Sequence, residues 1–217
     1  MFAKETQEDV ARFKKALAEL HQQYKAEGPS SPNTDLDDGL KLIEFFKERS
    51  LELNKRKEEL VLAEKLFDLS ISSFPELVSI DEENKNLQPL YDLYKEVKGI
   101  IKDYSATLWM KLDAEQLQKA IDKLYNQMRR KLSQKYSPEH PVYRQLNERI
   151  LAFKNSIPLI ILLKNGSITD RHWGKLMNLT GKKFEASIKT MTLSQVFDMK
   201  LEKYEEEVEE IVNEAIQ

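Results

Sequence analysis

The chain has 217 residues, with 34 lysines and arginines against 37 aspartates and glutamates, and a formal net charge of −3. This balance argues against a nucleic-acid-binding protein, which concentrates positive charge. Cysteine is absent, which excludes disulfides, thiolate metal sites and cysteine nucleophiles. The N-terminus is too charged for a signal peptide, and the longest apolar run, residues 157–163, is too short to span a bilayer. We therefore expect a soluble intracellular protein.

Apolar residues recur at alternating spacings of three and four along residues 8–27, which predicts a helix with one apolar face. The loop at 28–39 is rich in Gly, Pro, Ser and Asp, and it should end in a helix cap at Thr34 or Asp35.

A second long helix is predicted from Leu36 to about Ile71. Its seam carries Arg49 and Arg56, and each of these arginines needs a partner or a path to water. Because only half of the seam is apolar, we expect a helix of a monomeric bundle rather than a dimeric coiled coil.

A short turn at 75–80 and an acidic loop at 81–84 are predicted next. A third long helix should follow over 90–108, with Pro89 tolerated in its first turn. Asp113 is expected to cap a fourth helix, which ends before Pro138.

A fifth helix should open at Pro141 and be interrupted at Pro158, after which the predicted helices become shorter. Thr169 or Asp170 should cap a helix that ends at Gly181.

Thr192, with Gln195 three residues later, matches a capping box. The apolar seam after it predicts one unbroken helix to within two residues of the C-terminus. This uncapped end suggests a piece of a longer chain.

The fold class is therefore all-α, built as elongated antiparallel helical bundles with long helices before Pro158 and shorter ones after it. We expect two domains, residues 1–137 and residues 138–217. Breaks in the pattern at Phe74–Pro75, Ser137–Pro138 and Asn165–Gly166 are candidate points of bending.

No phosphate-binding loop can be assembled, because the six glycines stand alone in the sequence. The three histidines lack the spacing of metal ligands. We expect no cofactor, no metal and neither binding nor hydrolysis of ATP by this chain.

His172 allows two interpretations. It could act as an acid–base group oriented by Asp170 or by a residue that the fold brings near, which would make the chain a hydrolase. Alternatively, Trp173 packs into the core while Arg171 and His172 fix the start of a helix by hydrogen bonds. We favour the structural interpretation, because no nucleophile motif accompanies the histidine.

Two charged stretches are also ambiguous. A basic stretch between Lys119 and Lys135 could follow a phosphate backbone, but a solvated face or a surface facing an acidic protein fits its composition better. The glutamates between Glu202 and Glu210 indicate a solvated face or a docking surface.

Several short strings together resemble the region of dynein heavy chains where the tail passes into the linker. They are Ala63-Glu64-Lys65-Leu66-Phe67, Leu108-Trp109, Ile157-Pro158-Leu159-Ile160, Asp170-Arg171-His172-Trp173, Thr180-Gly181 followed by Phe184, and Thr192-Leu193.

The resemblance implies a non-catalytic, mechanical fragment. In dyneins a ring of AAA modules hydrolyses ATP, and a helical linker over that ring delivers the power stroke. Residues 1–137 would then end the tail and residues 138–217 would begin the linker. The motif residues would be structural: Pro158, Leu159, Ile160, Arg171, His172, Trp173, Thr180, Gly181 and Phe184.

The implied partners are the AAA ring and the rest of the same heavy chain, together with dynein intermediate or light chains. No nucleic acid or membrane is expected. The implied location is the cytoskeleton of the cytoplasm, or the axoneme of a cilium or flagellum if the parent is axonemal, as we expect. The alternative is a free-standing helical scaffold or adaptor that binds partner helices.

Overall fold

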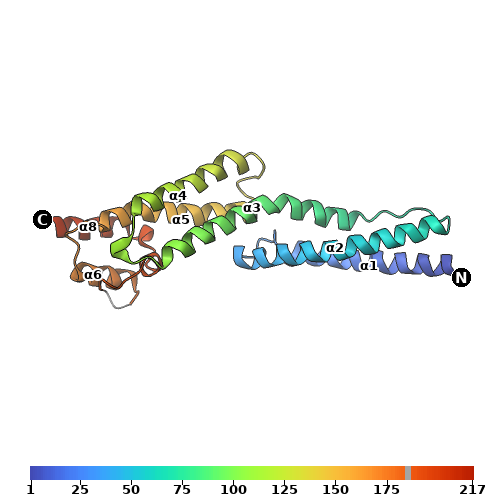
Figure 1. Ribbon diagram of the computed structural model, residues 1–217, viewed down its shortest axis with the longest axis horizontal. Coiled ribbons are helices and arrows are strands. Elements are labelled where there is room, and N and C mark those ends of the chain that lie inside the picture. The colour runs from blue at the N-terminus through green and yellow to red at the C-terminus, as the bar shows by residue number, and fades with distance from the viewer. Residues whose placement is uncertain (184–186) are drawn as a thin grey trace. The chain divides into compact units, whose positions relative to one another are not determined.

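A computed structural model describes residues 1–183 and 187–217. Helices hold 77% of the described residues, and no strand occurs among them, which confirms the all-α prediction (Figure 1). The chain divides into two compact units. Unit 1 comprises Met1–Asp92 with Glu139–Gln145, and unit 2 comprises Leu93–Pro138 with Leu146–Gln217.

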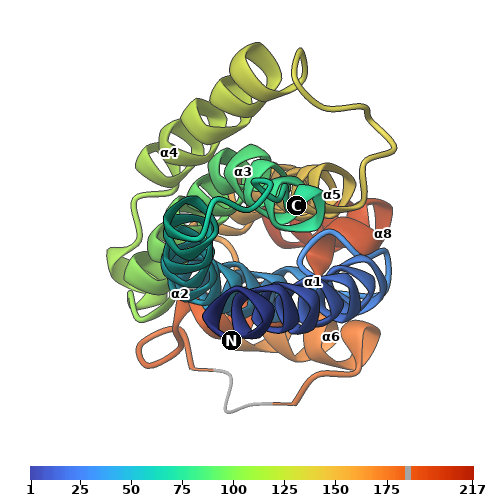
Figure 2. The same ribbon diagram turned by 90° about the vertical axis from the view of Figure 1, so that its right-hand side faces the viewer.

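Unit 1 is built from α1 (Phe2–Glu27), α2 (Leu36–Leu66) and the first part of α3 (Pro75–Ser105). Helices α1 and α2 run side by side (Figure 2). The apolar faces of the three helices meet in a core that includes Phe13, Leu17, Leu53, Leu60 and Leu77. Asp35 caps α2 as predicted, because its carboxylate accepts a hydrogen bond from the backbone N–H of Asp38.

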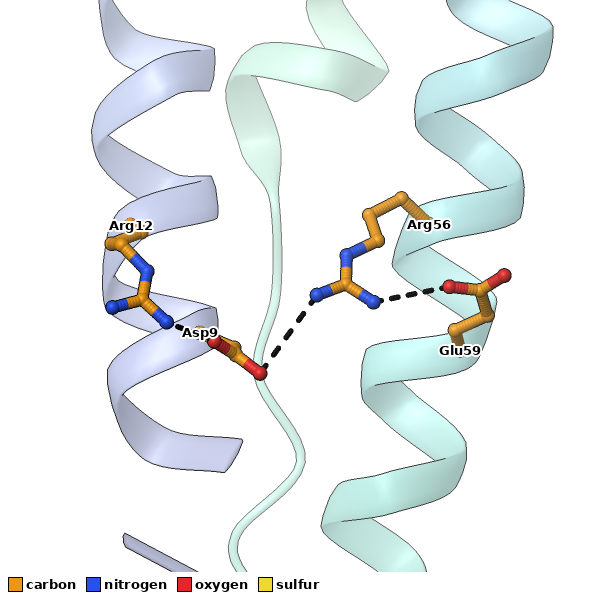
Figure 3. A network of polar contacts seen from close by, with 4 residues as sticks. All are labelled: Asp9, Arg12, Arg56 and Glu59. Carbon is orange, nitrogen blue, oxygen red and sulfur yellow. Dashed lines mark hydrogen bonds and ion pairs between the residues drawn. The ribbon is translucent and has the colours of Figure 1, made fainter. Parts of the chain in front are cut away.

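Both seam arginines of α2 lie at the surface of the bundle. Arg56 pairs with Glu59 at 3.1 Å on its own helix and with Asp9 of α1 at 3.8 Å, and Asp9 also pairs with Arg12 (Figure 3). Arg49 pairs with Glu52 of the same helix at 3.0 Å. The side chains of Arg49 and Arg56 are about half exposed, so these ion pairs contribute little to stability. The requirement for a partner or a path to water is therefore met by both.

Helix α3 differs from the prediction. It is continuous from Pro75 to Ser105, so the predicted turn and acidic loop before Pro89 are wrong. A proline inside a helix removes one hydrogen bond, but the residues around it, Leu87 and Leu90, are completely buried. We attribute the continuity of the helix to this burial.

The predicted acidic loop is helical because its polar side chains find partners in unit 1. Asn84 accepts a hydrogen bond from the hydroxyl of Tyr24 at 2.7 Å. Glu83 accepts one from the hydroxyl of Ser30 at 2.6 Å. Burial and the nearby Glu83 carboxylate raise the pKa of Tyr24, so this phenol stays a hydrogen-bond donor.

Unit 2 contains the rest of α3 and five further helices. They are α4 (Ala114–Gln127), most of α5 (Pro141–Leu163), α6 (Asp170–Thr180), α7 (Leu193–Asp198) and α8 (Glu205–Ile216). Helix α4 continues into a π-helical turn, η2 (Met128–Leu132), and two short 3₁₀ turns, η1 (Trp109–Lys111) and η3 (Leu201–Lys203), complete the unit.

Two helix boundaries in unit 2 also differ from the prediction. Pro158 lies inside α5 and does not interrupt it. The predicted unbroken C-terminal helix is instead α7, η3 and α8, because Lys200 adopts a left-handed backbone with φ of 50°. The turn at Lys200 allows Met199 and Leu201 on either side of it to be buried.

Two helix caps predicted from local sequence signals are present in unit 2. The carboxylate of Asp113 accepts a hydrogen bond from the N–H of Gln116 at the start of α4. Thr192 and Gln195 form the capping box at the start of α7.

Candidate functional site

Four of the strings that resemble dynein heavy chains come together in the core of unit 2. They lie far apart in the sequence, on η1, α5, α6 and α7. Their buried members share one apolar cluster: Trp109, Ile157, Leu159, Ile160, Trp173 and Leu193. The fold therefore assembles separate motifs into one site.

The centre of this cluster, which we call the tryptophan junction, consists of Trp109, Lys164 and Trp173. The two indole rings meet edge to face, with their centroids 5.0 Å apart. Such pairs are favoured by the charge distribution of aromatic rings. Trp173 is completely buried and Trp109 is 4% exposed. This arrangement joins α6 to the segment that connects α3 and α4.

Lys164, the residue directly after α5, is the third member of the junction. Its ammonium group lies 5.2 Å from the centre of the Trp109 ring and donates a hydrogen bond of 2.6 Å to the Trp109 carbonyl oxygen. Burial lowers the pKa of Lys164. No sequence signal paired Lys164 with a tryptophan.

A short backbone bridge holds the same region. The N–H of Trp109 donates to the carbonyl of Met191 at 2.8 Å, and the N–H of Leu193 donates to the carbonyl of Thr107 at 3.0 Å. Leu108 and Thr192 thus form an isolated antiparallel pair. This bridge fixes the connection after α3 to the start of α7.

The α5 string contributes its apolar residues to the core. Ile157, Leu159 and Ile160 are at most 2% exposed. Pro158 is exposed, so it does not pack into the junction.

His172 serves as part of a helix cap. Its Nδ1 accepts a hydrogen bond from the backbone N–H of Thr169 at 3.0 Å, and the Thr169 side chain accepts one from the backbone N–H of His172. This arrangement is a capping box with histidine in the place of the usual glutamate or glutamine. The other ring nitrogen, Nε2, is buried and has no partner among the described residues. Nδ1 therefore belongs to the cap, and Nε2 is shielded from solvent.

The remaining motif residues of α6 lie at its ends. The Asp170 carboxylate accepts a hydrogen bond from the N–H of Ile188 at 3.2 Å, while Arg171 is exposed. The Thr180 hydroxyl donates to the carbonyl of Leu176 at 2.9 Å. Gly181 ends the helix with φ of 71°, a conformation that glycine adopts without strain. Phe184 lies outside the described residues.

The remaining string, residues 63–67, lies in unit 1 and has a separate role. Glu64 is buried, and its carboxylate accepts hydrogen bonds from the N–H of Ser72 at 3.1 Å and the hydroxyl of Ser72 at 2.6 Å. These bonds fix the loop between α2 and α3. Sequence reasoning did not assign this role to Glu64.

Unit 2 also has a groove of about 160 Å³ between α5 and the segment of α7 and η3. Its walls are mainly apolar and include Phe153 and Phe197, whose ring centroids are 4.7 Å apart.

The described part of the chain contains no cluster of three or more histidine or carboxylate side chains that could hold a metal ion. Among the same residues, no helix is both long and apolar enough to cross a bilayer.

The cap at α6 yields a direct prediction. Replacing His172 with alanine removes the acceptor of the Thr169 N–H and should lower the free energy of unfolding by about 1 kcal/mol. His172→Gln keeps a side-chain acceptor at the same position and should recover most of this loss. Chemical denaturation of both variants is the measurement, and equal losses for Ala and Gln would contradict a capping role.

Comparison with known proteins gives the same family as the resemblance. A family model described as dynein heavy chain, N-terminal region 2, matches residues 77–217. The chain is 34% identical over 99% of its length to the dynein-1-alpha heavy chain of the flagellar inner arm I1 complex from Chlamydomonas reinhardtii. It is 35% identical over 99% of its length to dynein axonemal heavy chain 10 from Homo sapiens.

A further relative is dynein axonemal heavy chain 8 from Mus musculus, which is 29% identical over 96% of the chain. The chain spans only 5% of the length of the first two relatives and 4% of the third. The residues matched by the family model include all three residues of the tryptophan junction. The chain belongs to the dynein heavy chain family, as a part of the N-terminal region.

Proposed function

We propose that this chain is a mechanical element at the passage from tail to linker in an axonemal dynein heavy chain. It would transmit the ATP-driven change of the AAA ring to the tail during movement on microtubules. Its partners would be the AAA ring and the remainder of the same heavy chain, together with intermediate or light chains. The names of the relatives, which refer to axonemes and flagella, support a location in the axoneme of a cilium or flagellum.

The observation that carries this proposal is the convergence of four dynein-like strings in one close-packed core around the tryptophan junction. Close-packed interiors have low compressibility and transmit strain. A junction that joins three separate segments by ring contacts, a charged hydrogen bond and a backbone bridge is suited to carry force between them. No step of this role requires a catalytic group within the chain.

We further propose that residues 1–137 end the tail and residues 138–217 begin the linker. Bending would then be concentrated at connections between helices. The three breaks named from the sequence, Phe74–Pro75, Ser137–Pro138 and Asn165–Gly166, all lie at or next to such connections.

The test uses the full-length motor carrying Trp173→Ala, with Trp173→Phe as the matched control. Loss of the junction should slow microtubule gliding several-fold while the ATPase rate of the ring stays near that of the unmodified motor. Trp173→Phe keeps an aromatic ring and should glide at a speed close to the original. An undiminished gliding speed in a folded Trp173→Ala motor would contradict the mechanical role.

A further inference from the structure

A group of basic side chains lies exposed on α4, on η2 and on the turn that follows them. Residues 119–138 contain six basic residues and a single acidic one. The six, which we call the basic surface, are Lys119, Lys123, Arg129, Arg130, Lys131 and Lys135. All are exposed, and none forms an ion pair with any residue that the structure describes.

The π-helical turn η2 shapes this surface. Met128 and Leu132 at its two ends are buried, while the three consecutive residues between them, 129–131, are all exposed. Such turns are rare and are frequently found at functional sites. Here the turn presents three adjacent cations to solvent while its apolar residues stay in the core.

Helix α8, in the same unit, has the opposite charge. It contains six glutamates and no basic residue. One of them, Glu214, pairs with Lys175 of α6 at 2.6 Å, and this contact lowers its pKa. The other five form the acidic surface: Glu205, Glu206, Glu207, Glu209 and Glu210. These five are exposed and form no ion pair within the described part of the chain.

The two surfaces are separated within unit 2. Figure 1 shows the end of α4 and helix α8 far apart along the unit, so the cations of η2, which continues α4, do not neutralise the glutamates of α8 within it. The acidic surface is the more compact of the two, because its five glutamates lie within six residues of α8, about 9 Å of helix, whereas the basic surface extends over α4, η2 and the turn that follows. Their charges have opposite sign and similar number.

We propose that the basic surface of one copy of this chain docks against the acidic surface of a second copy. The contact pairs different surfaces on the two molecules, so it is a heterologous association that can extend along a row or close on itself. It rests on exposed charges and is therefore weak and sensitive to salt. This inference goes beyond the mechanical function and does not depend on it.

The test uses two triple variants of the 217-residue chain with reversed charges. R129E/R130E/K131E leaves three lysines and three glutamates at the six positions of the basic surface, and E206K/E207K/E210K leaves three lysines and two glutamates at the five positions of the acidic surface. Sedimentation velocity over a concentration series at about 25 mM salt measures association. We expect the unmodified chain to self-associate, and each variant alone to do so about tenfold or more weakly, because three ion pairs are lost.

Mixing the two variants is the decisive measurement. Each then offers the surface that the other lacks, so association should return in the mixture and disappear at about 500 mM salt. The matched control for R129E/R130E/K131E is K14E/K15E/K25E on α1, which makes the same change in net charge away from both surfaces and should associate like the unmodified chain. Circular dichroism confirms that each variant is folded.

Three results would overturn the proposal. The unmodified chain could remain monomeric at low salt, the mixture could fail to associate, or the α1 control could lose association as strongly as the other variants. The first two would mean that the charges face solvent or a different partner, and the third would mean that only net charge matters. None of them bears on gliding by a Trp173 variant, so failure here and failure of the mechanical role remain distinguishable.

Discussion

Replacement of Trp173 by alanine should lower the free energy of unfolding of unit 2 by about 3–5 kcal/mol. The side chain is completely buried, and its ring packs against Trp109 and the apolar residues of α5. Truncation removes one of the two tryptophan side chains of this core and leaves a cavity that neighbours on several elements cannot all fill. Both the lost burial and the cavity contribute to the cost.

Trp173→Phe is the control for this variant. The indole Nε1 is buried and has no acceptor among the described residues, so replacing it loses no hydrogen bond. The phenyl ring retains most of the aromatic contact, and the variant should lose less than half as much stability as Trp173→Ala.

Denaturant unfolding followed by fluorescence measures these losses. The chain has two tryptophans and both lie in unit 2, so the signal of Trp109 reports on this unit in the Trp173 variants. A loss below about 1 kcal/mol for Trp173→Ala would show that the junction is not a close-packed core.

Gly39→Ala should destabilise unit 1 by about 1–3 kcal/mol, even though alanine is the better helix former. Gly39 is a buried residue of α2, and a methyl group at this position would overlap the hydroxyl and ring of Tyr91. That hydroxyl donates a hydrogen bond of 2.6 Å to the carbonyl of Pro29. Either the ring moves and this buried bond breaks, or the two helices separate.

Two other helical glycines provide the matched controls. Gly99 of α3 and Gly174 of α6 have open space where a methyl group would lie. Alanine at either position should raise the free energy of unfolding by about 0.5–1 kcal/mol through helix propensity and a less flexible unfolded chain. Thermal unfolding followed by circular dichroism compares the three variants. A stabilising Gly39→Ala would contradict the close contact with Tyr91.

Local signals in the sequence were sufficient for part of the fold. The caps at Asp35, Asp113 and Thr192 were predicted correctly, because a cap depends on a side chain and backbone groups within about three residues of it. The all-α class followed from apolar periodicity, which reflects burial of one helical face. The dynein-like strings were recognised in the sequence, but their shared core was not.

Proline and helix continuity depended on packing. The sequence predicted Pro89 in the first turn of a helix and an interruption at Pro158, because proline is unfavourable inside a helix. The sequence did not show that the apolar residues beside each proline would be buried, nor that this burial would offset the lost hydrogen bond and keep the helix continuous. At Lys200 the apolar pattern predicted a continuous helix, but the helix is broken there by a left-handed backbone conformation. We attribute this break to the burial of Met199 and Leu201, which requires a turn between them.

By itself the sequence determined the fold class, the capping residues and the family, since these rest on short-range patterns and on strings of residues. Only the tertiary structure decided that Trp109, Lys164 and Trp173 meet in one junction. It also decided that His172 caps a helix from within the core. Residues far apart in sequence come into contact when several helices bury their apolar faces together, and no local pattern encodes which faces will meet.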